Sequence, residues 1–390
     1  MFSSTKKLDP NLKFLLASSS MKEYRILIQY RNFSDSILKK IHSYRGNIIR
    51  KIESCNIICA QLRAKSIHLL LEYPEVKYIC LDQYFFLCGM SIPTANKVRI
   101  SHKLSLYGRG IGVGIIDSGV YPHRDLTYPF NRIITFVDLI NELPYPYDDN
   151  GHGTHVSAMI AGSGAASGGI FKGIAPGSRI LGIKVLDRKG NGYAADVLMG
   201  LRWIREHRNE YGIRIVNISV GSLARQEMTE NSVLVKGVNA AWDDGLVVVV
   251  AAGNHGPAPG TVTTPGISRK VITVGCSDDH KEVEVMGSKM VDYSGRGPTK
   301  ACVCKPDIVA PGCGIISCCN EPGHYFIKSG TSMSTPLVSG AIALLLEKYP
   351  SISNKDVKLR ISARAVDLGL PHNQQGWGKL DVKRLLADEI

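Results

Sequence analysis

The hydrophobic pattern of residues 23–83 predicts a small domain of four strands and two helices. Residues 23–30, EYRILIQY, alternate between apolar and polar positions, as a half-buried strand does. The helical period of SDSILKKIHSYRG ends at Gly46, and that of AKSIHLLLEYP ends before Pro74. Three more strands are indicated by NIIRKIESCNIICAQL, which holds two of them, and by VKYICLDQ. The order strand, helix, strand, strand, helix, strand predicts an α+β module of ferredoxin-like type.

The pattern changes near residue 110, where near-continuous apolar strands begin to alternate with helices. The strands are indicated by GIGVGIID, RILGIKVLD, IRIVNISVG, LVVVVAAGN and VITVGC, and the helices by HVSAMIAGSG, AADVLMGLRWIREHRNEYG, ENSVLVKGVNAAWDDG and TPLVSGAIALLLEKYP. Strands that are apolar on both faces are typical of a parallel sheet covered by helices on both sides. We therefore expect an N-terminal extension at 1–22, the α+β module at 23–88, and a doubly wound α/β domain with a mostly parallel sheet at 89–390.

The net charge of +13 is concentrated in the N-terminal part of the chain. Residues 1–100 hold 16 Lys and Arg against 7 Asp and Glu, whereas the rest of the chain holds 31 against 27. No basic run is interleaved with aromatic residues, so nucleic-acid binding is not expected as the main role. The distribution favours either a solvated basic surface or a basic module that faces a less basic partner.

Neither a membrane span nor a secretory signal is recognised in the sequence. No stretch approaches the roughly 18 apolar residues of a spanning helix, and the apolar piece at residues 12–17 is interrupted by Lys13. We therefore expect a cytoplasmic location and no membrane partner. In that compartment the ten cysteines are expected to be thiols. Five of them cluster late, but their spacing does not match a paired C-x2-C zinc site: Cys302, Cys304, Cys313, Cys318 and Cys319.

Four polar residues follow strands or begin helices of the predicted α/β domain. They are Asp117 after GIGVGII, His152 between two glycines, Asn254 after LVVVVAAG, and Ser332 before the last long helix. Taken singly, each has a structural explanation as a helix cap or a turn residue. Taken together, an acid, an imidazole, an amide and a hydroxyl at the ends of parallel strands favour acyl transfer by a nucleophilic serine.

The motifs around these four residues resemble those of the subtilisin-like serine proteases, the subtilases. They read IIDSGV, GHGTHV, AAGN and GTSMSTP, and matches such as GIAPGSRILGIKVLD and KPDIVAPG extend the resemblance over roughly residues 105–385. The resemblance implies a serine endopeptidase that forms an acyl-enzyme. Ser332 is then the nucleophile, His152 the general base and Asp117 the residue that orients the imidazole. The Asn254 amide and the Ser332 backbone N–H are expected to hold the oxyanion.

The resemblance also implies where a peptide or protein substrate binds. The expected substrate-binding residues are Ser219, Val220 and Gly221, which offer a strand edge to an extended peptide, and Ala251, Ala252 and Gly253, which line the other side of the primary pocket. His155 is expected to be structural, because the base of the family is the first histidine of HGTH. Subtilases made without export signals look most similar, so we expect a bacterial enzyme of the intracellular type.

No cofactor is required for this chemistry, although many subtilases bind calcium. Asp125 in PHRDL matches one calcium-ligand position of the family. The loop in which the family often has a ligand asparagine reads GAASGGIFKG and contains none. We therefore expect the calcium site to be weak or absent. No metal ligand is assigned, and Asp125 is kept only as a weak calcium candidate.

The N-terminal module resembles in size the α+β pro-segments that assist folding and inhibit many subtilases. We expect it to be an intramolecular inhibitor that the enzyme removes by cutting itself between Phe85 and Met90, within the apolar tail LDQYFFLCGM. The structural alternative is a permanent N-terminal domain. The functional alternative is a pseudoprotease, or a latent regulatory binding protein with the same fold, which the intact set of four residues disfavours.

Overall fold

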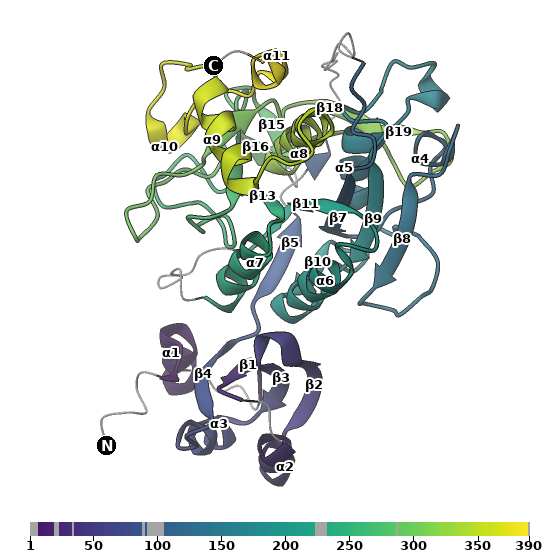
Figure 1. The fold of residues 1–390 in the computed structure, drawn as a ribbon. Helices are drawn as coiled ribbons and strands as arrows, with labels where there is room; N and C mark the ends of the chain where they lie inside the picture. The colour runs from purple at the N-terminus through teal and green to yellow at the C-terminus, as the bar shows by residue number, and fades with distance from the viewer. Residues whose placement is uncertain are drawn as a thin grey trace.

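The computed structural model describes residues 7–18, 23–32, 35–87, 90–91, 105–222, 232–285 and 288–388. It places the N-terminal module beside a larger α/β domain (Figure 1). The chain enters the larger domain along one extended segment, β5 (Tyr84–Leu87), which runs from the module into the domain.

The module has the predicted order of elements. These are β1 (Tyr24–Tyr30), α2 (Asp35–Ser43), β2 (Asn47–Ile52), β3 (Ile57–Leu62), α3 (Ala64–Leu71) and β4 (Val76–Leu81), with a 3₁₀ turn η2 (Glu53–Cys55) between β2 and β3. The strands form an antiparallel sheet in the order β2-β3-β1-β4. The predicted extension at 1–22 contains a helix, α1 (Pro10–Ser18), whose Leu12 is buried in the core of the module together with Leu8.

The larger domain is built on seven parallel strands in the order β17-β14-β13-β11-β7-β9-β8. In chain order they are β7 (Gly112–Asp117), β8 (Ile133–Asp138), β9 (Arg179–Lys184), β11 (Ile213–Ile218), β13 (Val247–Ala251), β14 (Ile272–Cys276) and β17 (Ile308–Ala310). The strand order reverses at β7, because the chain turns first to β8 and β9 on one side and later to β11 on the other. Ligand sites of open α/β sheets lie at such a reversal.

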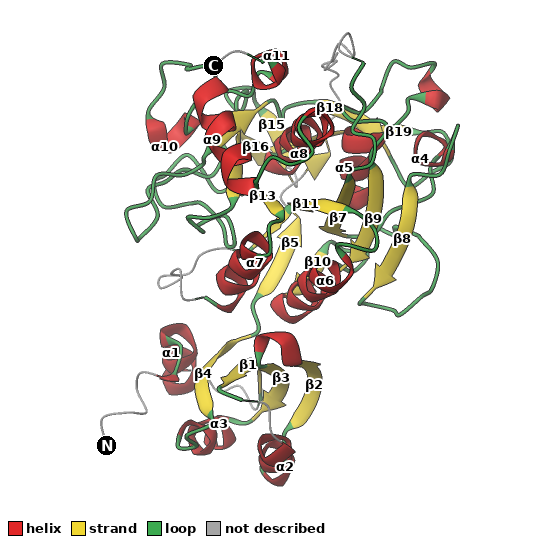
Figure 2. Cartoon of the chain, viewed as in Figure 1, coloured by secondary structure: helices red, strands yellow, loops and turns green. Residues whose placement is uncertain are grey.

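Two pairs of helices cover the two faces of this sheet (Figure 2). On one face α5 (His152–Ala161) packs against α8 (Thr331–Lys348), and on the other α6 (Ala194–His207) packs against α7 (Val233–Asp243). Because both faces are covered, every residue of β7, β13 and β14 is buried. The shorter helices are α4 (Arg124–Thr127), η3 (Ala165–Ser167), α9 (Asn354–Arg364), α10 (His372–Gln375) and α11 (Val382–Leu386). The predicted fold class is confirmed.

Small antiparallel sheets attach the segment after the module to the larger domain. β5 lies between β10 (Asn191–Tyr193) and β12 (Val220–Gly221). Further on, β6 (Met90–Ser91) pairs with β19 (Tyr325–Ser329), which also pairs with β18 (Ile315–Cys318). A separate hairpin joins β15 (Val283–Val285) and β16 (Ser288–Met290). Of the predicted cleavage interval, Cys88 and Gly89 lie outside the described residues.

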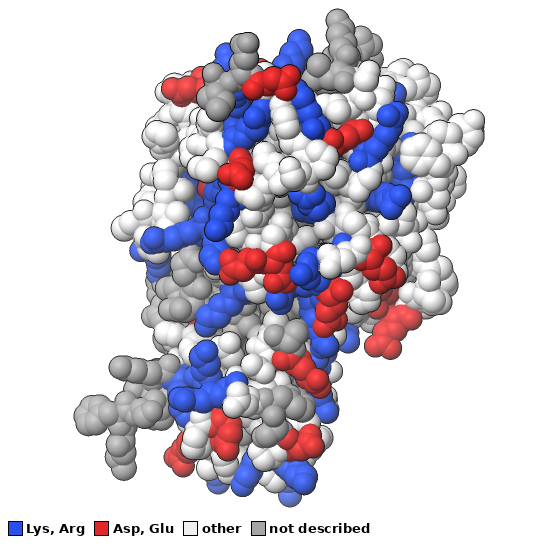
Figure 3. All heavy atoms as spheres, in the orientation of Figure 1, with Lys and Arg blue, Asp and Glu red and all other residues white. Residues whose placement is uncertain are grey.

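The surface shows no continuous charged field on the face in view. Lys and Arg side chains are interspersed with Asp and Glu over both the module and the larger domain (Figure 3). Among the described residues, no helix combines the length and the apolar character that a bilayer-spanning segment requires.

Candidate active site

Asp117 and His152 form a buried pair at the carboxyl end of β7. His152 Nδ1 lies 2.7 Å from Asp117 Oδ1, and neither side chain is exposed. The backbone N–H of Ser118 donates to the same oxygen at 2.7 Å. Because a carboxylate only accepts, the neutral imidazole donates through Nδ1 and keeps its lone pair on Nε2. That nitrogen is buried and has no hydrogen-bond partner among the described residues, so it is placed to accept a proton.

Asp148, which the sequence analysis missed, holds the start of the helix that carries His152. Its Oδ1 accepts from Gly151 N at 2.8 Å, and its Oδ2 accepts from Thr154 N at 2.9 Å and from Thr154 Oγ1 at 2.6 Å. Ser118 Oγ donates to Oδ1 at 2.9 Å and so joins this network to the strand end. A carboxylate is favoured at a helix N-terminus, where N–H groups lack partners. The signal was an acid four residues before His152 in DDNGHGTH.

Ser332 is the second residue of α8 and is fully buried. The helix begins after Gly330, whose φ of 136° lies in the region that favours glycine. Since α8 packs against α5, Ser332 and His152 begin neighbouring helices. The Ser332 hydroxyl donates to the carbonyl oxygen of Ser219 at 2.7 Å, so it is not directed at the imidazole.

The two other serines near this position serve the scaffold. Ser329 Oγ accepts from Gly314 N at 2.7 Å, and Ser334 Oγ donates to Ala310 O at 2.8 Å. Both side chains are fully buried. Their hydroxyls are therefore committed to backbone groups of the neighbouring strands and turns.

The Asn254 side chain is fixed by the first residue of α8. Its Oδ1 accepts from Thr331 N and from Thr331 Oγ1, each at 3.0 Å. Thr331 Oγ1 in turn accepts from Gly253 N at 3.1 Å. With Oδ1 occupied by these two donors, the amide presents Nδ2 as its donating end, close to the positive N-terminus of α8. Sequence reasoning identified Asn254 but not the anchoring role of Thr331.

The predicted substrate-binding residues lie along two edges. Val220 and Gly221 form β12, which pairs with β5, and the carbonyl of Ser219 just before it receives the Ser332 hydroxyl. Ala251 ends β13, and Ala252 and Gly253 follow it in a buried turn. A second strand edge, β10, was not predicted, because three residues in the stretch RKGNGY show no period.

Gly253 is required at its position by the backbone and by its neighbour. Its φ is +93°, and a Cβ added there would lie 2.4 Å from Thr263 Cγ2. Thr263 itself donates from its backbone N–H to Ala252 O at 2.8 Å. The turn that leads to Asn254 therefore admits no side chain at residue 253.

His155 is held as a neutral, structural histidine. Burial lowers its pKa well below the ordinary value, and the nearby charge of Lys328 adds to the effect. Its Nε2 lies 3.2 Å from both Ile315 O and Phe326 O, so the ring donates toward β18 and β19. The contact ties α5 to the hairpin that leads into α8.

Asp125, the calcium candidate, lies in an environment that does not fit calcium. Its Oδ1 accepts from Ala166 N at 2.8 Å, and its Oδ2 accepts from Tyr325 Oη at 2.8 Å and from Cys318 Sγ at 3.4 Å. His123 is the other metal-ligand type of side chain in the group. Calcium takes about six to eight oxygen ligands, whereas these neighbours, the Tyr325 hydroxyl apart, are N–H, thiol and imidazole groups.

Comparison with known proteins places the chain in a family. The model of the Subtilase family matches residues 108–378, which is more than half of the chain. The serine protease AprX of Bacillus subtilis is 36% identical over 334 residues, covering 80% of this chain and 75% of that protein. A thermostable alkaline protease of Halalkalibacterium halodurans is 31% identical over 359 residues, covering 91% of this chain and 90% of that protein.

A solved structure supports the same fold. Fervidolysin from Fervidobacterium pennivorans, a keratinolytic enzyme related to subtilisin, matches with a TM-score of 0.74 at 21% identity. The match covers 93% of this chain, which spans 61% of the fervidolysin chain. The chain belongs to the subtilase family and is a subtilisin-like serine protease.

Proposed function

We propose that the chain is a serine endopeptidase made as a zymogen, whose N-terminal module is a pro-segment that the enzyme removes by cutting its own tail. The observation that carries this proposal is the position of β5. The segment lies as an added strand between β10 and β12, in the way an extended peptide binds to a sheet edge. The edge that receives it includes the predicted substrate-binding residues Val220 and Gly221.

The proposed reaction uses the four residues named by the sequence. Ser332 Oγ attacks the peptide carbonyl while His152 Nε2 takes its proton, and Asp117 stabilises the resulting imidazolium. The Asn254 Nδ2 group and the Ser332 backbone N–H hold the oxyanion. The imidazolium then gives its proton to the leaving amine, which leaves an acyl group on Ser332. Water, activated by His152, releases the acid and restores the serine.

The Ser332 hydroxyl must turn before it can react. It is bonded to Ser219 O at 2.7 Å, while His152 Nε2 lacks a partner among the described residues. We propose that a rotation about the Cα–Cβ bond of Ser332 frees the hydroxyl from Ser219 O and turns it toward His152, which begins the neighbouring helix. We propose that the present arrangement is that of the latent precursor, since catalytic hydrogen bonds often tighten only with a reacting substrate.

Strand pairings on either side of the active site limit where the tail is cut. Before it, Phe86 pairs with Gly221 and Leu87 with Val220. After it, Met90 pairs with Ser329, three residues before Ser332. The proposed cut therefore falls at one of the three peptide bonds that join Leu87 to Met90, inside the interval expected from the sequence.

The contacts of the module support its role as a docked inhibitor. Asp82 Oδ1 accepts from Ala195 N at 3.0 Å at the start of α6, and Arg25 Nε lies 2.6 Å from Asp82 Oδ2. Arg50 Nε lies 2.9 Å from Asp196 Oδ1, also in the first turn of α6. A basic residue of the module thus meets an acidic residue of the catalytic domain, as the charge distribution predicts.

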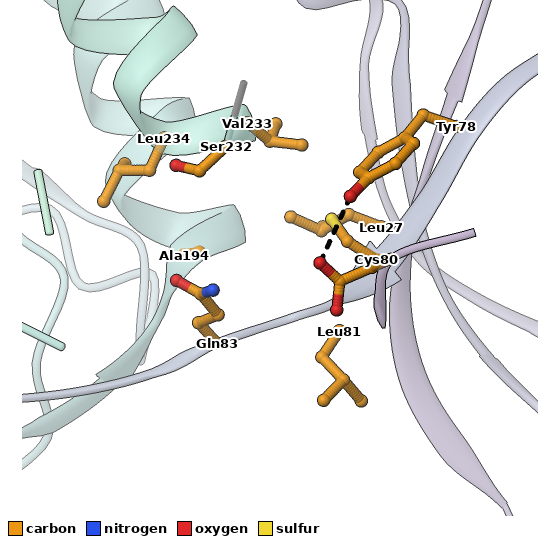
Figure 4. Close-up of a pocket in the computed structure, with 10 residues that line it drawn as sticks. Leu27, Tyr78, Cys80, Leu81, Gln83, Ala194, Ser232, Val233 and Leu234 are labelled. Carbon is orange, nitrogen blue, oxygen red and sulfur yellow. Dashed lines mark hydrogen bonds between the residues drawn. The ribbon is translucent and has the colours of Figure 1, made fainter. Parts of the chain in front are cut away.

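A cavity of about 30 Å³ lies between the module and helices α6 and α7, with room for one or two waters. Leu27, Tyr78 and Cys80 of the module face Val233 and Leu234 of α7 across it (Figure 4). Such apolar packing favours a module that stays bound after its tail is cut.

Labelling with a fluorophosphonate probe, which reacts with an activated serine, tests the proposed function. We expect wild-type protein to be labelled on Ser332 as the module is released, and Ser332→Ala to stay unlabelled. Ser334→Ala is the matched control, because its hydroxyl is bonded to Ala310 O, and it should be labelled like wild type. A folded wild-type chain that stays unlabelled after removal of the module would favour the pseudoprotease alternative.

A further inference from the structure

Three side chains of metal-ligand type are buried together outside the proposed catalytic group. His123 is the N-cap residue of α4, Asp125 lies in α4, and Cys318 ends β18. All three are fully buried, and one donor atom from each lies within 4.8 Å of the others. Cys318 is 193 residues from Asp125 in the chain, so the fold alone brings them together.

The donor atoms of the cluster are held by hydrogen bonds to one another and to nearby protein groups. Cys318 Sγ donates to Asp125 Oδ2 at 3.4 Å, and Tyr325 Oη donates to the same oxygen at 2.8 Å. His123 Nδ1 accepts from Asp125 N at 3.1 Å. His123 Nε2 is buried and makes no hydrogen bond of normal geometry with the described residues, although the His324 backbone near the ring favours its protonated form. A buried polar atom with so poor a partner is costly.

The ligand types indicate which cation fits. Calcium and magnesium take oxygen ligands, whereas zinc takes thiolate sulfur, imidazole nitrogen and carboxylate oxygen. Zinc bonds of about 2.0–2.3 Å place tetrahedral ligands about 3.3–3.8 Å apart. The 3.4 Å between Cys318 Sγ and Asp125 Oδ2 already lies in this range. Because the donor atoms of the three residues lie at most 4.8 Å apart, the widest pair would have to approach by about 1 Å to bind zinc.

We propose that His123, Asp125 and Cys318 form a structural site for a zinc-like divalent cation, at the place where the family resemblance suggested calcium. On binding, Cys318 loses its thiol proton to solvent and ligates as thiolate, His123 ligates as the neutral ring, and Asp125 ligates as carboxylate. Tyr325 keeps its hydrogen bond to the Asp125 carboxylate and orients it. Three protein ligands leave a fourth position for water.

The site joins two parts of the domain that lie side by side (Figure 1). α4 follows β7, which ends in Asp117, whereas β18 pairs with β19, which runs directly into the helix of Ser332. A cation there would therefore hold the β18–β19 hairpin against α4. The proposal concerns stability and does not rest on the proposed catalytic function.

Metal binding by the full-length chain tests the proposal. The parent protein carries Ser332→Ala, which prevents self-cleavage, and Cys302→Ser and Cys304→Ser, which remove the thiols that are exposed in the described part of the chain and could bind zinc adventitiously. We expect one zinc per chain by elemental analysis after dialysis, and a thiolate-to-cobalt absorption band on Co²⁺ titration. The melting temperature should rise with the logarithm of zinc concentration, and calcium should not produce this rise.

Matched variants assign the ligands. Cys318→Ser should weaken zinc binding by more than about 100-fold and abolish the cobalt band, and Tyr325→Phe should weaken binding by about 10–100-fold. Cys319→Ser is the control, because the Cys319 thiol contacts Glu321 O and not the cluster, and it should bind like the parent. If Cys318→Ser fails to fold, the isosteric Asp125→Asn replaces it, and we expect Asp125→Asn to weaken zinc binding as well. Less than one tenth of a zinc per chain, or equal binding by the parent and Asp125→Asn, would overturn the proposal.

Discussion

Replacing Asn254 by leucine tests the proposed oxyanion site, because the two ends of this amide have different functions. Oδ1 accepts from Thr331 N and Thr331 Oγ1, each at 3.0 Å, and so anchors the side chain to α8. Nδ2 is the proposed oxyanion donor. Asn254→Leu removes both ends, whereas Thr331→Val removes one anchor and leaves the donor in place.

The expected magnitudes differ between the two variants. Loss of an oxyanion donor costs about 10²–10³ in kcat, or about 2.7–4 kcal/mol, a value that comes from subtilisin, a member of this family. Asn254→Leu also leaves the buried Thr331 N–H without its acceptor, which costs about 1–3 kcal/mol of folding free energy. Thr331→Val should lower kcat by about two- to twelvefold, since one neutral hydrogen bond contributes about 0.5–1.5 kcal/mol.

The assay is peptide hydrolysis by the processed enzyme, with melting temperatures measured on the same substitutions in Ser332→Ala protein. We expect kcat to fall while KM stays nearly constant, because the donor acts on charge that develops only in the transition state. A kcat within threefold of wild type for Asn254→Leu would refute the assignment. So would a larger loss for Thr331→Val than for Asn254→Leu.

Three further substitutions probe the scaffold. Asp82→Ala removes the charged acceptor of Ala195 N, worth about 1.5–3 kcal/mol, so the cut module should dissociate about 10–150-fold more readily, measured as the free active enzyme present after processing. Gly253→Ala places a Cβ 2.4 Å from Thr263 Cγ2 at φ +93°, and we expect a loss of about 1–3 kcal/mol in stability that Thr263→Ala partly restores. Burial lowers the pKa of His155 in the folded state. Below about pH 6.5 the unfolded chain therefore binds a proton on this residue, whereas the folded protein does not. The melting temperature should therefore fall as the pH drops below that value, and His155→Gln should flatten the slope between pH 6.5 and 5; equal slopes in both proteins would contradict this account.

Local periodicity was enough to predict the elements that carry the fold. The two helices and four strands of the module and five of the seven parallel strands of the larger domain each show their own period or apolar run, and motif positions at strand ends pointed to Asp117 and His152. The strands β8 and β17 were not predicted. Features that depend on long-range contact were not predictable. β10 pairs with β5, which lies far earlier in the chain. The environment of Asp125 depends on Cys318 and Tyr325, and neither spacing nor composition indicates that contact.

The orientation of Ser332 was equally hidden from the sequence. Its motif predicts the nucleophile, but the hydrogen bond of the hydroxyl to Ser219 O at 2.7 Å is set by a side-chain rotamer. Two rotamers of one serine differ by little free energy, and no residue pattern encodes which is occupied.

The most direct test of the central claim is a time course of intact mass on purified wild-type protein and Ser332→Ala. We predict that wild type loses an N-terminal fragment that ends at Leu87, Cys88 or Gly89, while Ser332→Ala keeps its full mass of about 42.6 kDa. The strand pairings on both sides of this interval set the expected ends. Equal processing of both proteins, or a wild-type cut outside these three bonds, would contradict the account.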